Sequence, residues 1–258
     1  MSVVSLELGT VAEVALDNGP LNLVTDALLA ELEAAFEALE SAAPGDVRAV
    51  VLTGRGERAF SVGSDVKAFE DHRGPGGRRR FQLEARVAQR LAGLPMPTIA
   101  AIEGSALGGG LELALCCDLR VASERATLGL PEVRLAVTPS TGATQRLPRI
   151  IGIARAKELL LTGRVIDAHE ALRIGLVHEV VPAGEAVTRA HAIGREIAER
   201  GPLAVRAVKA LVDGALDRPL PAGHDAEVET SVRIFATDDL LEGARSFLEK
   251  RPPEYHGR

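Results

Sequence analysis

The chain has 258 residues, of which 46% are hydrophobic and 26% charged, so it suits a folded domain with a full core and not a mostly disordered chain. Aromatic residues make up only 3% and the formal net charge is −6, which argues against nucleic-acid binding by base stacking or a basic surface. No stretch approaches the roughly 20 apolar residues of a membrane span, and residues 1–7 lack the basic start of a secretory signal, so we expect a cytoplasmic protein without a membrane partner.

The N-terminal part predicts the order strand, strand, helix, strand. Residues 3–8 and 11–16 are rich in β-forming residues and are separated by a short turn. Thr25 is a candidate N-cap for a helix that reaches about residue 43. Residues 47–52 are almost continuously apolar, which is typical of a strand covered on both faces.

The alternation of strands and helices then continues. The expected elements are a helix at 78–93, a strand at 98–102, a helix at 111–117 and a strand at 119–122. Such alternation favours an α/β fold with mostly parallel strands. From about residue 152 we expect mainly helices, at 153–161, 168–174, 186–200, 202–216 and 226–249, with one strand at 177–181. The sequence therefore predicts an α/β core at residues 1–190 and a helical C-terminal region at residues 191–258.

Several well-known catalytic motifs are missing from the sequence. Cys116 and Cys117 are adjacent, so they form neither a spaced disulfide pair nor a zinc site, and we interpret them as reduced thiols in the core. The histidines form no HxxxH or HExxH pair, and there is no GxSxG, GxxxxGK[ST] or GxGxxG sequence. No metal or redox cofactor is implied.

Three consecutive glycines, Gly108 to Gly110, follow a predicted buried strand and open a predicted helix. Glycine allows a ligand to approach the backbone, and the start of a helix offers N–H donors to an oxygen that gains negative charge. The alternative is that these glycines bind no ligand and only allow the helix to pack closely against the strand. Glu112 in the first helical turn can cap the helix dipole, and Glu132, taken alone, has the pattern of a solvated surface residue.

A set of segments spread along the chain points to one family. They are Pro20-Leu21-Asn22-Leu23, residues 59–67 (AFSVGSDVK), 97–104 (PTIAAIEG), 106–114 (ALGGGLELA), 117–120 (CDLR), Pro131-Glu132-Val133, 144–147 (TQRL), 161–163 (LTG), 175–177 (GLV) and 247–251 (FLEKR). Together, and in this order, they resemble the crotonase family of enoyl-CoA hydratases and isomerases, and most of all its enoyl-CoA hydratases.

The resemblance implies a spiral of repeated ββα units with a helical C-terminal trimerisation region, and hence a homo-trimer or homo-hexamer. It also implies an acyl-CoA thioester substrate whose carbonyl oxygen lies between the backbone N–H groups of Ser64 and Gly109. CoA would enter as part of the substrate, with no separate cofactor. The residues implied in acyl-CoA binding are Leu21, Leu23, Ser64, Asp65, Val66, Lys67, Leu107, Gly108, Gly109, Pro139 and Ser140.

The reaction depends on two glutamates, because Glu112 and Glu132 match the hydratase pattern in type and in their spacing of 20 residues. Two carboxylates can hold one water and divide the proton transfers, whereas one carboxylate suits the 1,3-proton shuttle of an isomerase. The expected reaction is therefore syn addition of water across the 2,3 double bond of a 2-enoyl-CoA. Glu112 would orient and deprotonate the water, and Glu132 would donate the proton to C2.

Departures from the family pattern leave alternatives open. Ser64 stands where alanine is common in the family, and Ala136, Ser140 and Ala143 stand where glycine is frequent. One alternative is therefore an isomerase or an acyl-CoA hydrolase of the same fold. An RNA-binding protein on this scaffold is the alternative from another class, and its support is the run Arg78-Arg79-Arg80. That run is either a solvated helix start or a handle for the CoA phosphates.

Overall fold

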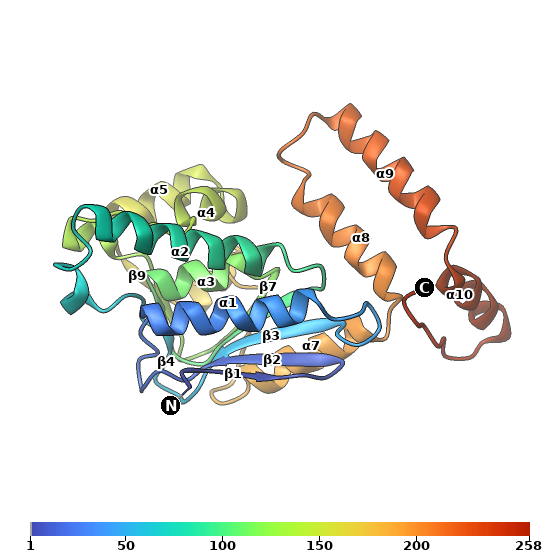
Figure 1. Ribbon diagram of the computed structural model, residues 1–258, viewed down its shortest axis with the longest axis horizontal. Coiled ribbons are helices and arrows are strands. Elements are labelled where there is room, and N and C mark those ends of the chain that lie inside the picture. Colours follow the sequence, from blue (N-terminus) through green and yellow to red (C-terminus); the bar gives the residue numbers. More distant parts are fainter. Residues whose placement is uncertain (1) are drawn as a thin grey trace.

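The computed structural model describes residues 2–258, which form two sheets and their covering helices (Figure 1). The larger sheet has the strand order β1 (Val4–Glu7), β2 (Val11–Leu16), β3 (Ala49–Gly54), β5 (Thr98–Ile102), β7 (Leu119–Ser123) and β10 (Glu179–Val181). Its neighbours are parallel, apart from the antiparallel pair β1 and β2. The smaller sheet has the order β4 (Ala59–Ser61), β6 (Ser105–Leu107), β8 (Thr127–Gly129) and β9 (Val165–Asp167).

A strand–strand–helix unit repeats along the first 151 residues. The helices that close the four units are α1 (Asp26–Glu40), α2 (Pro75–Ala92), α3 (Gly109–Cys116) and α4 (Ala143–Ile151). In the last three units the first strand belongs to the larger sheet and the second to the smaller sheet. The predicted β-β-α-β opening and the spiral of ββα units are confirmed, and the side chain of Thr25 caps α1 by accepting the N–H of Leu28.

Strand β3 is buried along its whole length because helices cover both of its faces. Its Val50 and Leu52 belong to the apolar cluster that includes the buried side of α1. Val51 points the other way and packs with Ala186 and Ala190 of α7 (Ala186–Ala198). The alternation of side chains along a strand thus explains why a continuous apolar run was needed here.

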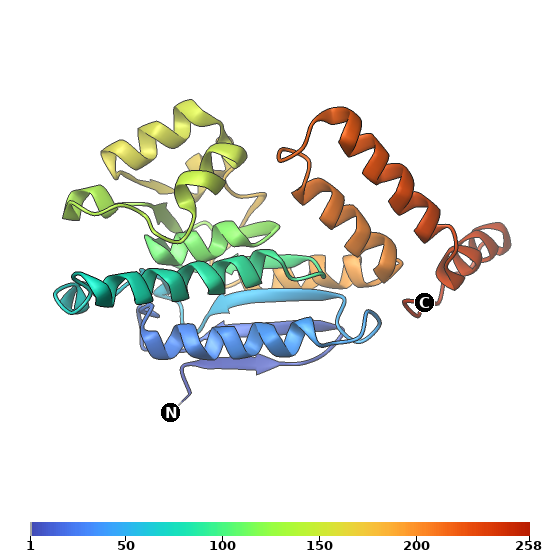
Figure 2. The ribbon, with the colours of Figure 1, turned by 45° about the horizontal axis from the view of Figure 1, so that its top comes forward.

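The last helices of the chain extend away from the sheets (Figures 1 and 2). They are α8 (Pro202–Asp213), α9 (Leu220–Ile234) and α10 (Asp238–Glu249), and they follow α5 (Ile153–Thr162), α6 (Ala168–Arg173) and α7. The predicted boundary after residue 190 falls inside α7, which still packs on the larger sheet. The single helix predicted over residues 226–249 is wrong: the chain turns after α9, and the Thr237 side chain accepts the N–H of Leu240 and starts a new helix.

An ion pair attaches α8 to the core. The Lys209 ammonium lies 2.6 Å from Oδ1 of Asp118, which follows α3. The same carboxylate accepts the backbone N–H of Thr98 at 2.7 Å, at the start of β5. The first helix of the C-terminal region is therefore joined to the central strands of the larger sheet.

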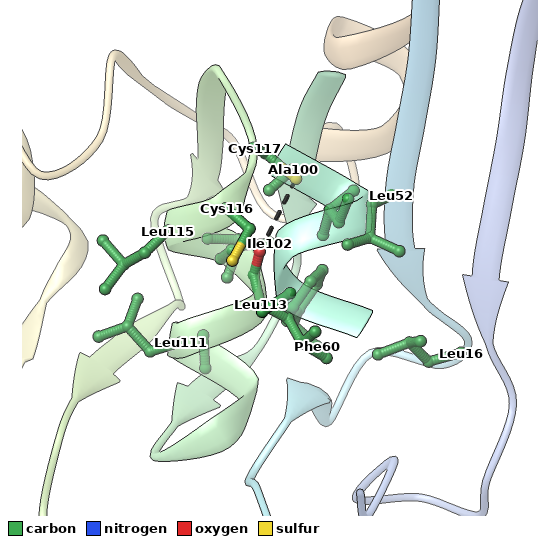
Figure 3. Packing of buried hydrophobic residues seen from close by; sticks show 14 of the residues in the cluster. Leu16, Leu52, Phe60, Ala100, Ile102, Leu111, Leu113, Leu115, Cys116 and Cys117 are labelled. Carbon is green, nitrogen blue, oxygen red and sulfur yellow. Dashed lines mark hydrogen bonds between the residues drawn. The ribbon is translucent and has the colours of Figure 1, made fainter. Parts of the chain in front are cut away.

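Cys116 and Cys117 lie in the apolar core beside α3, as predicted (Figure 3). Both thiols are unpaired and buried, and their Sγ atoms face carbonyl oxygens one helical turn earlier, those of Glu112 and Leu113. Burial raises the pKa of Cys116 to about 11 and that of Cys117 further. Neither thiol is therefore a nucleophile at neutral pH. Among the described helices, none has the length and apolarity that crossing a bilayer requires.

Candidate active site

A cavity of about 340 Å³ lies between α2, the start of α3 and the segment 131–141. Eight residues predicted from the sequence line its wall: Ser64, Val66, Gly108, Gly109, Glu112, Glu132, Pro139 and Ser140. They come from three separate stretches of the chain, 64–66, 108–112 and 132–140. The ββα repeat therefore brings the predicted catalytic pair and the predicted backbone donors to one place.

The other predicted binding residues lie outside the cavity wall: Leu21, Leu23, Asp65, Lys67 and Leu107. The Asp65 side chain accepts the N–H of Lys67 at 3.0 Å and so begins the short 3-10 helix η1 (Val66–Ala68). The Lys67 side chain itself is exposed. Contact of these five residues with an acyl-CoA stays a prediction.

Two backbone amides in the cavity wall have no acceptor in the part of the chain that the structure describes. They belong to Ser64 and to Gly109, the first residue of α3. The segments approach closely because Gly63 has no side chain: a Cβ there would lie 2.9 Å from the nitrogen of Gly109. A pair of such amides can bind a carbonyl oxygen and stabilise it as it becomes an oxyanion.

Glu112 is fixed by the backbone of the segment opposite. The residue is only 2% exposed, and its Oε1 accepts the N–H groups of Thr141 at 2.8 Å and Ala143 at 3.0 Å. Burial raises the pKa of Glu112, and these two hydrogen bonds oppose the rise without cancelling it. One carboxylate oxygen is therefore held in place by the backbone.

Glu132 is the less constrained carboxylate of the pair. It opens the 3-10 helix η2 (Glu132–Leu135), and both of its carboxylate oxygens are buried without a hydrogen-bond partner in residues 2–258. Burial, with a smaller contribution from the charge of Glu112, raises the pKa of Glu132 to about 7. Such a group can gain or lose a proton at neutral pH, as general acid–base catalysis requires. The surface position expected for Glu132 from its local sequence alone is wrong.

A third glutamate in the wall, Glu84 of α2, was not predicted. It is 4% exposed. Its Oε1 accepts a hydrogen bond from Nε of Arg80 at 2.9 Å, and its Oε2 accepts the Ser140 hydroxyl at 2.8 Å. Opposite charges four residues apart on a helix are a recognisable signal, so the Arg80–Glu84 spacing could have indicated this pair.

The run Arg78-Arg79-Arg80 does not act as a unit. Arg80 is buried, at 5% exposed, and also donates to the Asp26 carboxylate and to the Val24 carbonyl oxygen. For Arg80, the solvated helix start is therefore wrong, and these contacts argue against the phosphate handle. Arg78 and Arg79 are exposed, and their contact with CoA phosphates stays a prediction.

No group of three or more His, Cys, Asp or Glu side chains in the described residues is arranged to hold a metal ion. The chemistry that this wall can provide is proton transfer by two carboxylates beside two backbone donors. That combination suits a carbonyl compound whose neighbouring carbons gain or lose a proton.

Comparison with known proteins gives consistent matches. The sequence model of one family, described as enoyl-CoA hydratase/isomerase, matches residues 7–258. The short-chain-enoyl-CoA hydratase of Clostridium acetobutylicum is 38% identical over 91% of this chain and 89% of its own length. The mitochondrial methylglutaconyl-CoA hydratase of Rattus norvegicus is 40% identical over 92% of this chain and 76% of its own. A crystal structure of enoyl-CoA hydratase from Bacillus anthracis superposes with a TM-score of 0.96 at 40% identity, over 99% of this chain and 100% of that one.

Proposed function

The chain belongs to the enoyl-CoA hydratase/isomerase family, and from this premise we propose that it adds water syn across the 2,3 double bond of a 2-enoyl-CoA. The observation that carries the proposal is the position of Glu112 and Glu132, which line one cavity together with Ser64 and Gly109. An isomerase needs one carboxylate to move a proton between two carbons. Hydration uses two, and the cavity wall holds both.

The backbone donors act on the thioester. Its carbonyl oxygen accepts the N–H groups of Ser64 and Gly109, which have no acceptor within residues 2–258. When the hydroxyl of the attacking water adds to C3, negative charge moves onto this oxygen and both hydrogen bonds strengthen. A donor of this kind contributes about 3–4 kcal/mol to lowering the barrier.

The two glutamates divide the proton transfers. Glu112 is held through Oε1, so its Oε2 accepts a proton from the attacking water as the new C3–O bond forms. Glu132, whose pKa is raised to about 7, delivers its proton to C2 of the enolate. One proton leaves water and one reaches carbon, so the product is the neutral 3-hydroxyacyl thioester and the pair still carries one proton.

The loss of the 2-enoyl thioester absorbance of crotonyl-CoA tests this proposal. We expect fast hydration by the wild type and a fall of about 10³-fold or more in kcat for Glu112→Gln and for Glu132→Gln. Glu124→Gln is the matched control, because Glu124 is exposed and outside the cavity wall. Full activity in both cavity variants would contradict the two-carboxylate mechanism. A wild type that moves the double bond of 3-enoyl thioesters but adds no water would indicate an isomerase.

We also propose that the chain assembles as a homo-trimer or as a homo-hexamer. Large apolar side chains are exposed on the three helices that extend from the core: Val208, Val212, Leu220, Val228, Val232, Phe235, Leu241, Phe247 and Leu248. Exposed apolar surface of this extent is typical of an interaction site. Light scattering coupled to size-exclusion chromatography would give three or six times 27.1 kDa, whereas a monomer at micromolar concentration would contradict the assembly.

A further inference from the structure

The cavity contains a carboxylate that the proposed reaction does not use. Glu84 lies in the wall with Glu112 and Glu132, and it is only 4% exposed. Its two oxygens are held by Arg80 and Ser140, so the side chain is fixed in position. Arg80 is shared between Glu84 and Asp26, so the three groups together carry one negative charge, which acts on any charge that the substrate brings into the cavity.

The hydroxyl groups nearest to Glu84 are directed toward it. Ser140 Oγ lies 2.8 Å from Oε2 of Glu84, and Ser64 Oγ lies 3.5 Å from Oε1. A serine hydroxyl has one proton, and at 2.8 Å that of Ser140 is committed to Glu84, so toward the cavity Ser140 Oγ offers lone pairs only. The longer Ser64 contact is weak.

The buried cation in the wall already has three acceptors. Arg80 donates through Nε to Glu84, through Nη1 to Asp26 and through Nη2 to the Val24 carbonyl oxygen at 2.7 Å. Arg73 lines the cavity too, but its side chain is exposed to water, where its field is screened. A substrate carboxylate would thus find no buried cation in the described wall that is not already paired with a carboxylate.

The rest of the wall favours an apolar chain. Its side chains include Val66, Phe69, Phe81, Leu135 and Val137. Such a surface stabilises hydrocarbon by removing it from water, whereas an anion placed against it loses hydration without gaining a partner.

We propose that Glu84 is a specificity-determining residue that restricts the cavity to uncharged acyl groups. This inference rests on the proposed hydratase function and defines its substrate class: 2-enoyl-CoA thioesters with a neutral acyl chain. An acyl chain ending in a carboxylate would be repelled by Glu84 and would find no unpaired buried cation. The family, in contrast, contains hydratases named for neutral short chains and for the carboxylated methylglutaconyl group.

The test compares two substrates of similar shape and different charge. Glutaconyl-CoA ends in a carboxylate, and 5-methylhex-2-enoyl-CoA replaces this carboxylate with an isopropyl group. We expect the wild type to prefer the neutral thioester by about 100-fold in kcat/KM. Glu84→Gln keeps the volume of the side chain and removes its charge, so the preference should narrow by about tenfold or more. Ser140→Ala keeps the charge and removes one hydroxyl, so the preference should persist.

The ratio of the two kcat/KM values is measured within each variant, so a general loss of activity cancels. Equal values in the wild type, or an unchanged ratio in Glu84→Gln, would overturn the proposal. If Glu84→Gln does not fold, calorimetry on the wild type decides instead: glutaryl-CoA must bind at least about tenfold more weakly than 5-methylhexanoyl-CoA, and equal Kd values overturn the proposal. If neither enoyl thioester is hydrated, the hydratase function fails, and the same calorimetry still decides the charge preference.

Discussion

Glu132 lies directly against Gly108: a Cβ placed on Gly108 would come within 3.4 Å of Oε1 of Glu132. Gly108 also has φ +52° and ψ −129°, a backbone conformation that residues with a side chain rarely adopt. One glycine therefore turns the chain into α3, with the Gly109 amide next in sequence and the Glu132 carboxylate at contact distance. The backbone donor and the proton donor of the proposed mechanism meet at this glycine.

Gly108→Ala should therefore reduce both stability and activity. The backbone strain should lower the free energy of unfolding by about 2 kcal/mol. Displacement of the Gly109 amide by this strain should lower kcat for crotonyl-CoA by about 100-fold. Gly152→Ala is the matched control, because Gly152 has φ +81° and no atom lies within 4 Å of the position that a Cβ would take there. This control should lose stability and keep its kcat. An equal loss of kcat in both variants would contradict the role of Gly108.

The raised pKa of Glu132 predicts a bell-shaped pH dependence of kcat/KM. The active form of the pair carries one proton, and hydration neither takes up a proton from solution nor releases one to it. Above about pH 7 Glu132 loses that proton, so kcat/KM should fall about tenfold per pH unit. Because the equilibrium constant is independent of pH, hydration of crotonyl-CoA and dehydration of 3-hydroxybutyryl-CoA should show the same descending limb. A rate that keeps rising above about pH 8 in either direction would contradict the assignment.

The same carboxylate should reduce stability at alkaline pH. Below its ordinary pKa of 4.5, Glu132 is protonated in the folded and in the unfolded chain, and burial costs little. Between pH 4.5 and about 7, the unfolded chain ionises while the folded chain keeps the proton, so the free energy of unfolding falls as pH rises. Above about pH 7 the loss is constant.

Glu132→Gln removes this effect. At about pH 8 the variant should be more stable than the wild type by about 2 kcal/mol, and at about pH 4 the two should be equal. Thermal unfolding at one fixed protein concentration measures both differences. A variant less stable than the wild type at the alkaline pH would mean that the two buried oxygens of Glu132 have stabilising partners in solution.

Periodicity along the sequence could predict the larger sheet but not the smaller one. Strands β2, β3 and β5 have five or six residues each, long enough to show an apolar pattern. Strands β4, β6 and β8 have three residues each, and so short a segment has no measurable period. Pro148 lies inside α4, where proline argues against a helix, and that helix was not predicted.

For the site, the residue types were predictable and their environments were not. Glu112 and Glu132 follow from the motifs that resemble the family, and they meet in one cavity. The burial of Glu84 and Arg80 depends on tertiary packing. Charged residues normally lie on the surface, so the sequence of this segment does not reveal their burial. The restraint on Glu112 likewise comes from backbone N–H groups about 30 residues further along the chain, which carry no sequence signal.

Arg80 should prove to be a structural residue and not a ligand for CoA phosphates. Arg80→Ala leaves the buried Glu84 carboxylate without its cation, and we expect the free energy of unfolding to fall by about 3 kcal/mol. Arg79→Ala, on the same helix but exposed, should change it by less than about 0.5 kcal/mol. Arg80→Ala combined with Glu84→Ala should recover part of the loss, because no unpaired charge is then buried. Equal stability of Arg80→Ala and Arg79→Ala in denaturant unfolding, with a KM for crotonyl-CoA raised only by Arg80→Ala, would instead assign Arg80 to the substrate.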